Sequence, residues 1–264
     1  MALPFATAHG AGRAQDTPGV ELAHLTWVEA EAVLHGDAIV VIPLGAAAKE
    51  HGPHLPLDND LRMAEYLAKR VLESAEVVIA PAVTYHFYPS FLEYPGSTHL
   101  SFETSRDLIV DIVRSIASHG PRRFYVLNTG VSTLRPLVAS AEILRDEGII
   151  LSFTNIIEVA GPVEEEIREQ VRGTHADEIE TSMMLYIAPD VVDMSLAVRE
   201  DNPRGSGGLT RNRATGGTYS KSGVWGDATL ATVEKGRIIV EATVDGILKD
   251  IEALRAMPLT HSAK

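Results

Sequence analysis

The amino-acid sequence predicts an α/β fold with a mostly parallel sheet flanked by helices on both faces. Short apolar runs alternate along the chain with longer stretches in which apolar residues recur at helical spacing, the pattern of strand–helix–strand units. The apolar runs are continuous, as expected for strands that are covered on both sides. With 264 residues, 45% of them hydrophobic, the chain can bury one large core. We therefore expect a single domain over residues 23–264.

The expected strands and helices follow one another in order. Strands are predicted at residues 37–45, 77–83, 123–128 and 148–153. Helices are predicted at residues 61–72, from a cap at Thr104 to a stop at Gly120, and at residues 134–145. Ligands of open α/β sheets bind at the carboxyl ends of the strands. Segments 46–60 and 129–133 are therefore where chemistry is expected.

The glycine-rich stretch 202–217 carries too few apolar side chains to pack by itself. We predict a mobile surface loop there, with a flap over a ligand site as the alternative. Residues 1–22 are expected to be a disordered leader of a cytoplasmic protein. An exported protein is the alternative, with residues 1–14 as the remnant of a signal peptide, although the basic segment of such a signal is missing.

Composition excludes several classes of partner and site. The net charge of −13 disfavours nucleic acid, which requires a basic surface. No apolar run approaches the roughly 20 residues that span a bilayer, so no membrane partner is expected. The chain has no cysteine, which excludes disulfides and thiolate chemistry. Any metal must therefore be held by His, Asp or Glu.

Two histidines and several carboxylates follow the first expected strand. His51, His54 and Asp60 lie in this segment, and their side chains are suitable ligands for zinc or manganese. The alternative is a solvated acidic loop in which Asp58 and Asn59 cap the next helix. This segment alone favours neither interpretation strongly.

A second segment, residues 175–187, resembles a helix with a carboxylate on its apolar face. Glu180 lies in the centre of a stripe that includes Met183 and Met184. A carboxylate on a buried face is unfavourable unless it is paired or bound to a metal. An ion pair is the alternative, but the His/Asp loop makes metal ligation the preferred interpretation. Glu178 is expected to point into solvent.

Together these motifs resemble the creatininase (creatinine amidohydrolase) family. That family carries a G-x-x-E-Q-H-G-x-H loop followed by an Asp, an N-G-H after a later strand, and H-x-G-x-x-E-T-S at the start of a helix. The resemblance extends over about residues 25–254. The matching positions here are His51, His54, Asp60, Tyr94 to Thr98, His175, Glu180 to Ser182 and Glu234 to Gly236.

The resemblance implies one metal site and the loss of a second. In the family two metals share the Asp. Here His51, Asp60 and Glu180 would hold one divalent metal, zinc in the first place, with manganese and iron as alternatives. Lys49 and Gly130 occupy positions of second-metal ligands, and an ammonium group repels a cation. At most one metal is therefore expected.

The resemblance also assigns catalytic residues. His175 stands at the position of the family's catalytic histidine, a general acid and base near neutral pH. Lys49 is expected to pair with Asp60 and to help hold the developing oxyanion. Glu50, one position away from the lost ligand, is expected to point elsewhere.

The function that the resemblance implies is metal-dependent hydrolysis of a non-peptide C–N bond, in a small linear or cyclic amide. Val171 replaces an aromatic residue of the creatinine pocket, so creatinine itself is not the expected substrate. Trp225 either lines the pocket or packs in the core. Family members form hexamers, so a homo-oligomer is expected. The alternative is a degenerate, non-catalytic member that binds a small molecule or serves as an assembly subunit.

Overall fold

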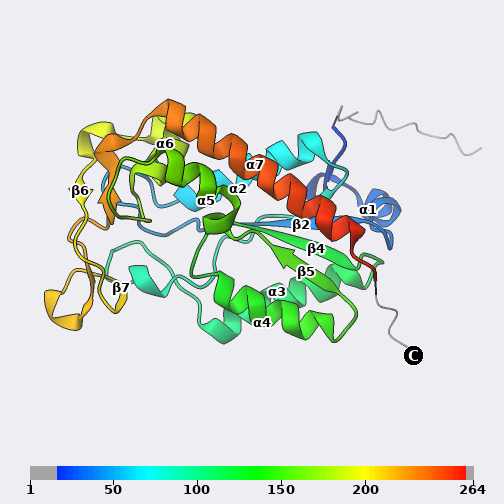
Figure 1. The fold of residues 1–264 in the computed structure, drawn as a ribbon. Helices are drawn as coiled ribbons and strands as arrows, with labels where there is room; N and C mark the ends of the chain where they lie inside the picture. Colours follow the sequence, from blue (N-terminus) through cyan, green and yellow to red (C-terminus); the bar gives the residue numbers. More distant parts are fainter. Residues whose placement is uncertain (1–16, 260–264) are drawn as a thin grey trace, which may run out of the picture.

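The computed structural model describes residues 17–259, and a five-stranded parallel sheet forms its centre. The strand order is β1-β3-β2-β4-β5, and every neighbouring pair is parallel. Figure 1 shows the twisted sheet between two layers of helices, which confirms the predicted fold class. The strands are β1 (Val20–Glu21), β2 (Ile39–Leu44), β3 (Val78–Ile79), β4 (Arg123–Asn128) and β5 (Ile150–Phe153).

Helices cover both faces of the sheet, and each layer builds its own core (Figure 1). One face carries α2 (Asn59–Ser74), α5 (Ile156–Ile167), α6 (Glu178–Ile187) and α7 (Val233–Ala256). The other face carries α1 (Trp27–Val33), α3 (Phe102–Ala117) and α4 (Leu134–Arg145).

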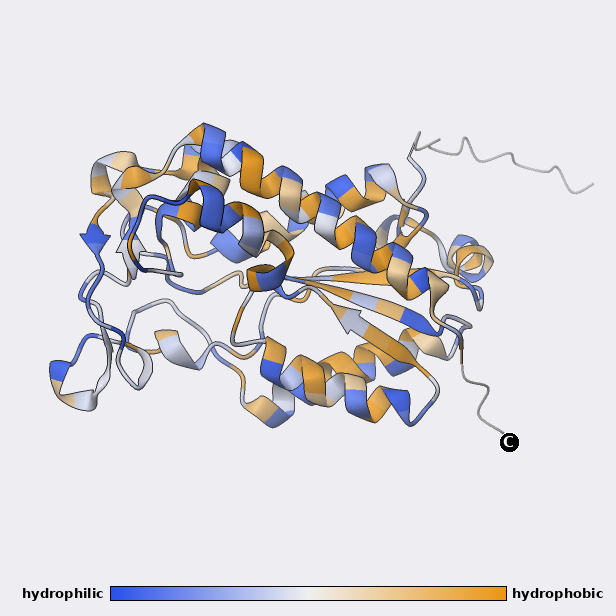
Figure 2. Cartoon of the chain, viewed as in Figure 1, coloured by the Kyte–Doolittle hydropathy of each residue, from blue (hydrophilic) through white to orange (hydrophobic). Residues whose placement is uncertain are grey.

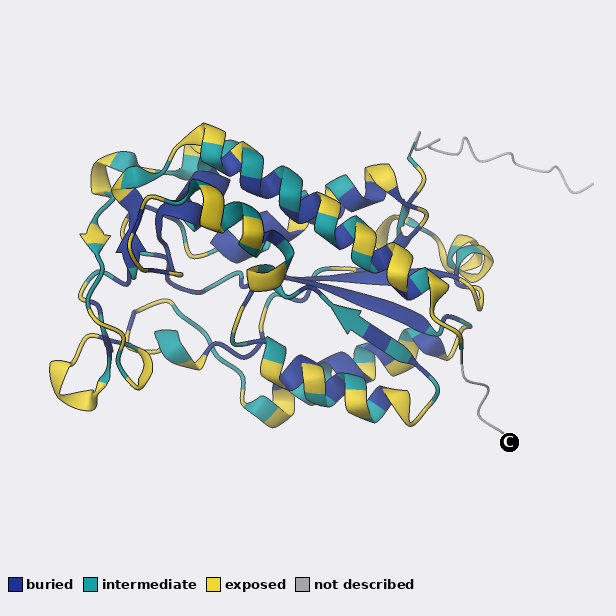
Figure 3. Cartoon of the chain, in the orientation of Figure 1, coloured by how far each residue is buried: buried dark blue, intermediate teal, exposed yellow. Residues whose placement is uncertain are grey.

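The central strand β2 shows why its residues form a buried strand. Ile39 and Val41 contribute to the core beneath α2 and α7, whereas Val40 and Ile42 contribute to the core beneath α3 and α4. Side chains of a strand alternate between its faces, so an unbroken apolar run fills both cores. The strands are accordingly mostly apolar in Figure 2 and largely buried in Figure 3.

The start of α3 differs from the prediction. We expected Thr104 to cap this helix, but the N-cap is Ser101, whose Oγ accepts a hydrogen bond from the backbone N–H of Thr104 at 3.2 Å. Both residues carry a hydroxyl group that can cap a helix. The sequence pattern alone therefore does not separate them.

The N-terminal segment is described only in part. Residues 1–16 of the predicted leader lie outside the described residues. Within the remainder, Val20 and Glu21 form the edge strand β1, paired with Val78 and Ile79 of β3. No helix within residues 17–259 is long and apolar enough to cross a membrane.

The glycine-rich stretch forms a small ordered unit. β7 (Gly207–Thr210) pairs with β8 (Gly217–Tyr219), and β7 packs on the short helix η2 (Pro89–Phe91). A Cβ atom at Gly208 would lie only 2.4 Å from Ser90 Oγ, so this approach requires glycine. Figure 1 shows β7 at one end of the molecule, near β6 (Arg199–Glu200). β6 pairs with β9 (Gly226–Asp227).

Candidate active site

The candidate site lies at the carboxyl ends of β2 and β4, which end side by side at Leu44 and Asn128. Gly45 follows β2, and a Cβ atom there would lie 2.3 Å from the carbonyl oxygen of Asp60. Only glycine therefore lets the first turn of α2 approach the end of β2. The backbone N–H of Leu61 donates to Ala46 O at 3.2 Å and closes this contact.

Both carboxylate oxygens of Asp60 face a basic group. Lys49 Nζ lies 2.7 Å from Oδ2, and His51 Nε2 lies 2.8 Å from Oδ1. The side chains of Lys49 and Asp60 are only 6% and 1% exposed. Burial alone would raise the pKa of Asp60, but the Lys49 ammonium and His51 outweigh it and hold that pKa below its usual range. The predicted pairing of Lys49 with Asp60 is present.

The burial of Lys49 does not neutralise it. Desolvation favours the neutral amine, but the nearby carboxylates of Asp60 and Glu180 outweigh this effect and raise the pKa of Lys49. The ammonium also lies 4.8 Å from the centroid of the Phe91 ring, within reach of a cation–π interaction. Lys49 is therefore a fixed positive charge in the site.

His175 is held against Glu50, contrary to the prediction that Glu50 points elsewhere. His175 Nε2 lies 2.8 Å from Glu50 Oε1, and the backbone N–H of Gly52 donates to Glu50 Oε2 at 2.9 Å. Gly52 adopts a positive φ of 70°, which glycine accommodates readily. This turn folds the Glu50 carboxylate back toward His175. The sequence pattern did not predict the contact between Glu50 and His175, because this contact depends on the turn at Gly52.

The charge of Glu50 determines the electrostatics of His175. Burial favours the neutral ring, but Glu50 and, more weakly, Glu180 outweigh it and raise the pKa of His175. Burial would likewise raise the pKa of Glu50, but His175 lowers it on balance. The imidazole ring packs between those of Phe91, at 4.5 Å between centroids, and His51, at 5.0 Å.

Glu180 completes a cluster of three groups that could hold a metal. Its Oε2 lies 3.7 Å from His175 Nδ1. Within the described residues, one ligand atom each of His51, His175 and Glu180 lies within 4.8 Å of the others. Asp60 adjoins this cluster through His51. Two of the three predicted metal ligands, His51 and Glu180, thus lie in the cluster together with the predicted catalytic histidine, and Asp60 lies beside it.

The burial of the two carboxylates in segment 175–187 differs from the prediction. Glu180 lies at a partly exposed position, with 21% of its side chain accessible. Glu178, predicted to be solvated, is buried and accepts backbone N–H bonds from Glu169 at 3.0 Å and Gln170 at 2.7 Å. Lys235 Nζ also donates to it. Helix α6 begins at Glu178 rather than at residue 175, so helical periodicity misplaced its first turn.

The remaining motif residues support the loop that carries the site. His54 Nε2 lies 2.8 Å from Thr181 Oγ1, and burial lowers the pKa of His54 to about 4. Ser97 Oγ accepts from the backbone N–H of Glu50 at 3.0 Å. The Y-P-G-S-T motif and His54 therefore have structural roles that sequence patterns did not assign.

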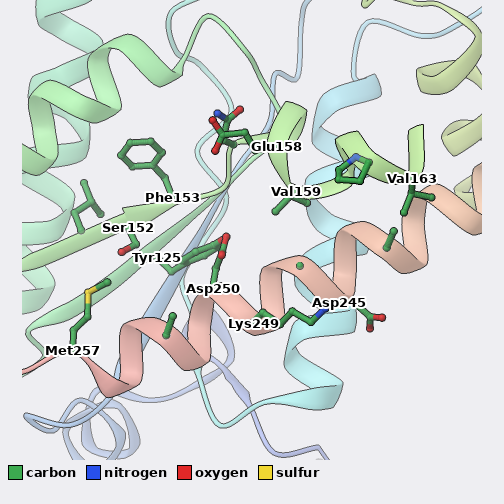
Figure 4. Close-up of a pocket in the computed structure, with 16 residues that line it drawn as sticks. Tyr125, Ser152, Phe153, Glu158, Val159, Val163, Asp245, Lys249, Asp250 and Met257 are labelled. Carbon is green, nitrogen blue, oxygen red and sulfur yellow. The ribbon is translucent and has the colours of Figure 1, made fainter. Parts of the chain in front are cut away.

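A separate groove lies outside this site. It has a volume of about 830 Å³ and lies where β5 and the helices α5 and α7 meet (Figure 4). The Tyr125 hydroxyl at its wall lies 2.9 Å from Thr154 Oγ1 and donates to Asp250 Oδ2 at 3.1 Å. None of the predicted site residues lines it.

Comparison with known proteins identifies the family. The family model named Creatininase, described as creatinine amidohydrolase, matches residues 23–251. This chain belongs to the creatininase family. Creatinine amidohydrolase of Pseudomonas putida is 28% identical over 257 residues, covering 86% of this chain and 94% of that protein. The predicted family is therefore confirmed.

Other creatininase relatives support the same assignment. The mycofactocin precursor peptide peptidase of Mycolicibacterium smegmatis is 31% identical over 215 residues, covering 79% of this chain and 82% of that protein. A solved structure described as creatininase Mn is 25% identical, with a TM-score of 0.74, and the match covers 90% of this chain and 100% of that one. The creatininase-like fold and the amidohydrolase class are thus both supported.

Proposed function

We propose that this creatininase-family protein is a metal-dependent hydrolase of a non-peptide amide C–N bond in a small molecule other than creatinine. The observation that carries the proposal is the cluster of His51, His175 and Glu180, which Asp60 adjoins through His51. Glu50 holds His175 in place beside it. Val171 stands at the position where the resemblance implies an aromatic residue of the creatinine pocket. Its side chain is aliphatic and 75% exposed, so it forms no aromatic wall.

The charges of the site favour one divalent ion. Three carboxylates, those of Glu50, Asp60 and Glu180, face one ammonium group, that of Lys49. With His51 neutral as a ligand and His175 neutral as a base, the cluster carries two net negative charges, which one divalent cation balances. Buried charge is costly unless it is compensated. A mixed set of imidazole and carboxylate ligands suits zinc, with manganese and iron as alternatives.

We propose that His51, Asp60 and Glu180 hold this ion and that His175 remains the acid and base. A divalent cation there would supply Lewis acidity, polarising a carbonyl oxygen and making water more acidic. If His175 Nε2–H donates to Glu50, Nδ1 is left to accept a proton from the attacking water. The same nitrogen can then protonate the leaving amine. Lys49 contributes a fixed positive charge that favours the developing oxyanion.

Activity measurements test this proposal. Protein loaded with zinc or manganese is assayed against a panel of small linear and cyclic amides, beside the variants His175→Asn and Glu180→Gln. The proposal expects hydrolysis that needs metal and is lost in both variants. Hydrolysis that persists in both variants, or no metal-dependent hydrolysis of any amide, would contradict it.

The second candidate is a non-catalytic family member that binds a small molecule or serves as an assembly subunit. It is favoured by the loss of family ligands at Lys49 and Gly130. The same assays decide between the two, since this candidate predicts ligand binding or assembly without turnover. In either case we propose a cytoplasmic homo-oligomer, with a hexamer as the first expectation. Light scattering that reports a particle of 28.5 kDa would contradict the assembly.

A further inference from the structure

The side chain of Trp225 shares a face with that of His175. The two residues form an antiparallel bridge, in which Trp225 N–H donates to His175 O at 2.9 Å and His175 N–H donates to Trp225 O at 3.3 Å. Residues that are directly paired in this way project their side chains from the same face. The flanking residues Val224 and Ala176 point the other way, into a small apolar core. The indole side chain therefore leaves the bridge on the same face as the proposed catalytic imidazole.

An arginine is stacked on this indole ring. The guanidinium of Arg204 lies 5.6 Å from the centroid of Trp225, within the range of a cation–π interaction. Trp225 Nε1–H donates to Asn202 O at 3.0 Å, which fixes the ring. The backbone beside Arg204 is fixed as well, because Gly205 N–H donates to Thr218 Oγ1 at 3.0 Å.

Arg204 is exposed. Within residues 17–259, no carboxylate oxygen lies within 4.0 Å of its guanidinium nitrogens. Asp201, the nearest acidic residue in the sequence, is paired with Arg199 at 2.9 Å. In a chain with a net charge of −13, an arginine that has no carboxylate beside it and that contacts the residue bridged to His175 is available to an anionic ligand.

We propose that Arg204, supported by Trp225, binds a carboxylate group of the substrate. This inference rests on the proposed function and narrows its substrate class to small amides that carry a carboxylate. The planar guanidinium matches a carboxylate with two parallel N–H bonds. Arg204 is not among the groups that cluster around His175. It therefore acts on substrate binding rather than on the chemical step.

Tryptophan fluorescence measures this binding directly. The chain has two tryptophans, and Trp27 is 77% exposed, so Trp27→Phe leaves Trp225 as the reporter. The probes are succinamate, an anionic amide, and butyramide, a neutral amide of the same chain length. We expect succinamate to bind about tenfold more tightly, the factor expected for one charge-assisted hydrogen-bonded pair.

Variants of two arginines in the same stretch supply the decisive comparison. In Arg204→Gln the preference for succinamate should fall to nearly equal binding. Arg213→Gln is the matched control, because Arg213 is stacked on Tyr219 at 3.6 Å instead, and the preference should remain. Equal binding of both probes to the parent, no binding of either, or an unchanged preference in Arg204→Gln would each overturn the inference.

Repeating the titration with His175→Asn separates this inference from the proposed function. His175→Asn should abolish hydrolysis and leave the preference for succinamate intact. If no amide is hydrolysed but the Arg204-dependent preference persists, the proposed function fails and the carboxylate site stands. If amides are hydrolysed with equal KM for neutral and anionic members, only the carboxylate site fails.

Discussion

The ammonium of Lys49 lies 2.7 Å from Oδ2 of Asp60, and both side chains are buried. The family resemblance implies an acidic metal ligand at the position of Lys49, so we propose that this chain replaces one anion with a cation beside Asp60. The resemblance implies that two metals share this aspartate in the family. Here the Lys49 ammonium supplies the positive charge that the second metal would supply. We propose that Lys49 takes over the electrostatic role of that metal.

Lys49→Glu should destabilise the metal-free protein. It removes the partner of buried Asp60 and adds a second negative charge beside it. The loss of one partner from a buried ion pair typically costs about 3–5 kcal/mol. Urea unfolding measures this change. Lys69→Glu is the control at an exposed lysine and should alter stability little. Equal stability of Lys49→Glu and the parent would mean that the pair does not stabilise the fold.

The double variant Lys49→Glu with Gly130→His should recover part of that loss when zinc or manganese is added. It restores both family ligands, and a second ion should then bind. A Cβ atom at residue 130 would lie 3.0 Å from Thr133 Oγ1, so Gly130→His alone serves as the control for local strain. Absence of a second ion in the double variant would contradict the mapping of these two positions.

Glu50→Gln should lower kcat about tenfold with little change in KM. The amide keeps the shape of the side chain but removes the charge that holds His175 at 2.8 Å. General acid–base catalysis contributes about 10²–10⁴-fold when the group is well positioned, so partial loss of positioning gives a smaller factor. Steady-state kinetics measure it. Glu241→Gln, at a pair with Arg70 away from the site, should leave kcat unchanged. A rise in KM alone would assign Glu50 to substrate binding instead.

Lys235→Met should destabilise the fold by about 3–5 kcal/mol. Lys235 Nζ donates to Glu178, which is fully buried and also receives two backbone N–H bonds. Without the ammonium, this carboxylate is buried without a countercharge. Calorimetry measures the change, and adding Glu178→Gln to Lys235→Met should recover part of it. If the double variant is no more stable than Lys235→Met, the uncompensated charge is not the cause.

His86 should make stability fall as the pH decreases below 6.5. Burial lowers the pKa of His86 to about 4, so between pH 6.5 and 4 the unfolded chain binds a proton that the native state does not. The free energy of unfolding is therefore unaffected by the protonation of His86 above pH 6.5 and decreases by about 3 kcal/mol as the pH falls to 4. Urea unfolding at several pH values should show a flatter dependence for His86→Gln than for His119→Gln at an exposed position. Parallel profiles would contradict this role.

The sequence predicted the fold well because the fold depends on patterns that are local along the chain. The strand at residues 123–128 and the helix at residues 134–145 have the observed bounds. Of the metal ligands that the family resemblance implied, His51 and Glu180 lie in the cluster, whereas its third member is His175 rather than Asp60. The roles of Glu50 and Glu178 were missed because each depends on a partner distant in sequence, His175 and Lys235 respectively. The spacing of apolar residues indicates which face of a helix is buried, but it does not indicate which loop covers that face.

Elemental analysis of the purified protein decides whether Lys49 replaces the second cation. If Lys49 takes the role of the second cation, protein saturated with zinc or manganese and then freed of excess metal contains one divalent ion per chain. Mass spectrometry of the intact chain checks that Lys49 is unmodified. Two tightly bound ions per chain with unmodified Lys49 would contradict the account, and no bound ion would contradict the proposed metal-dependent chemistry.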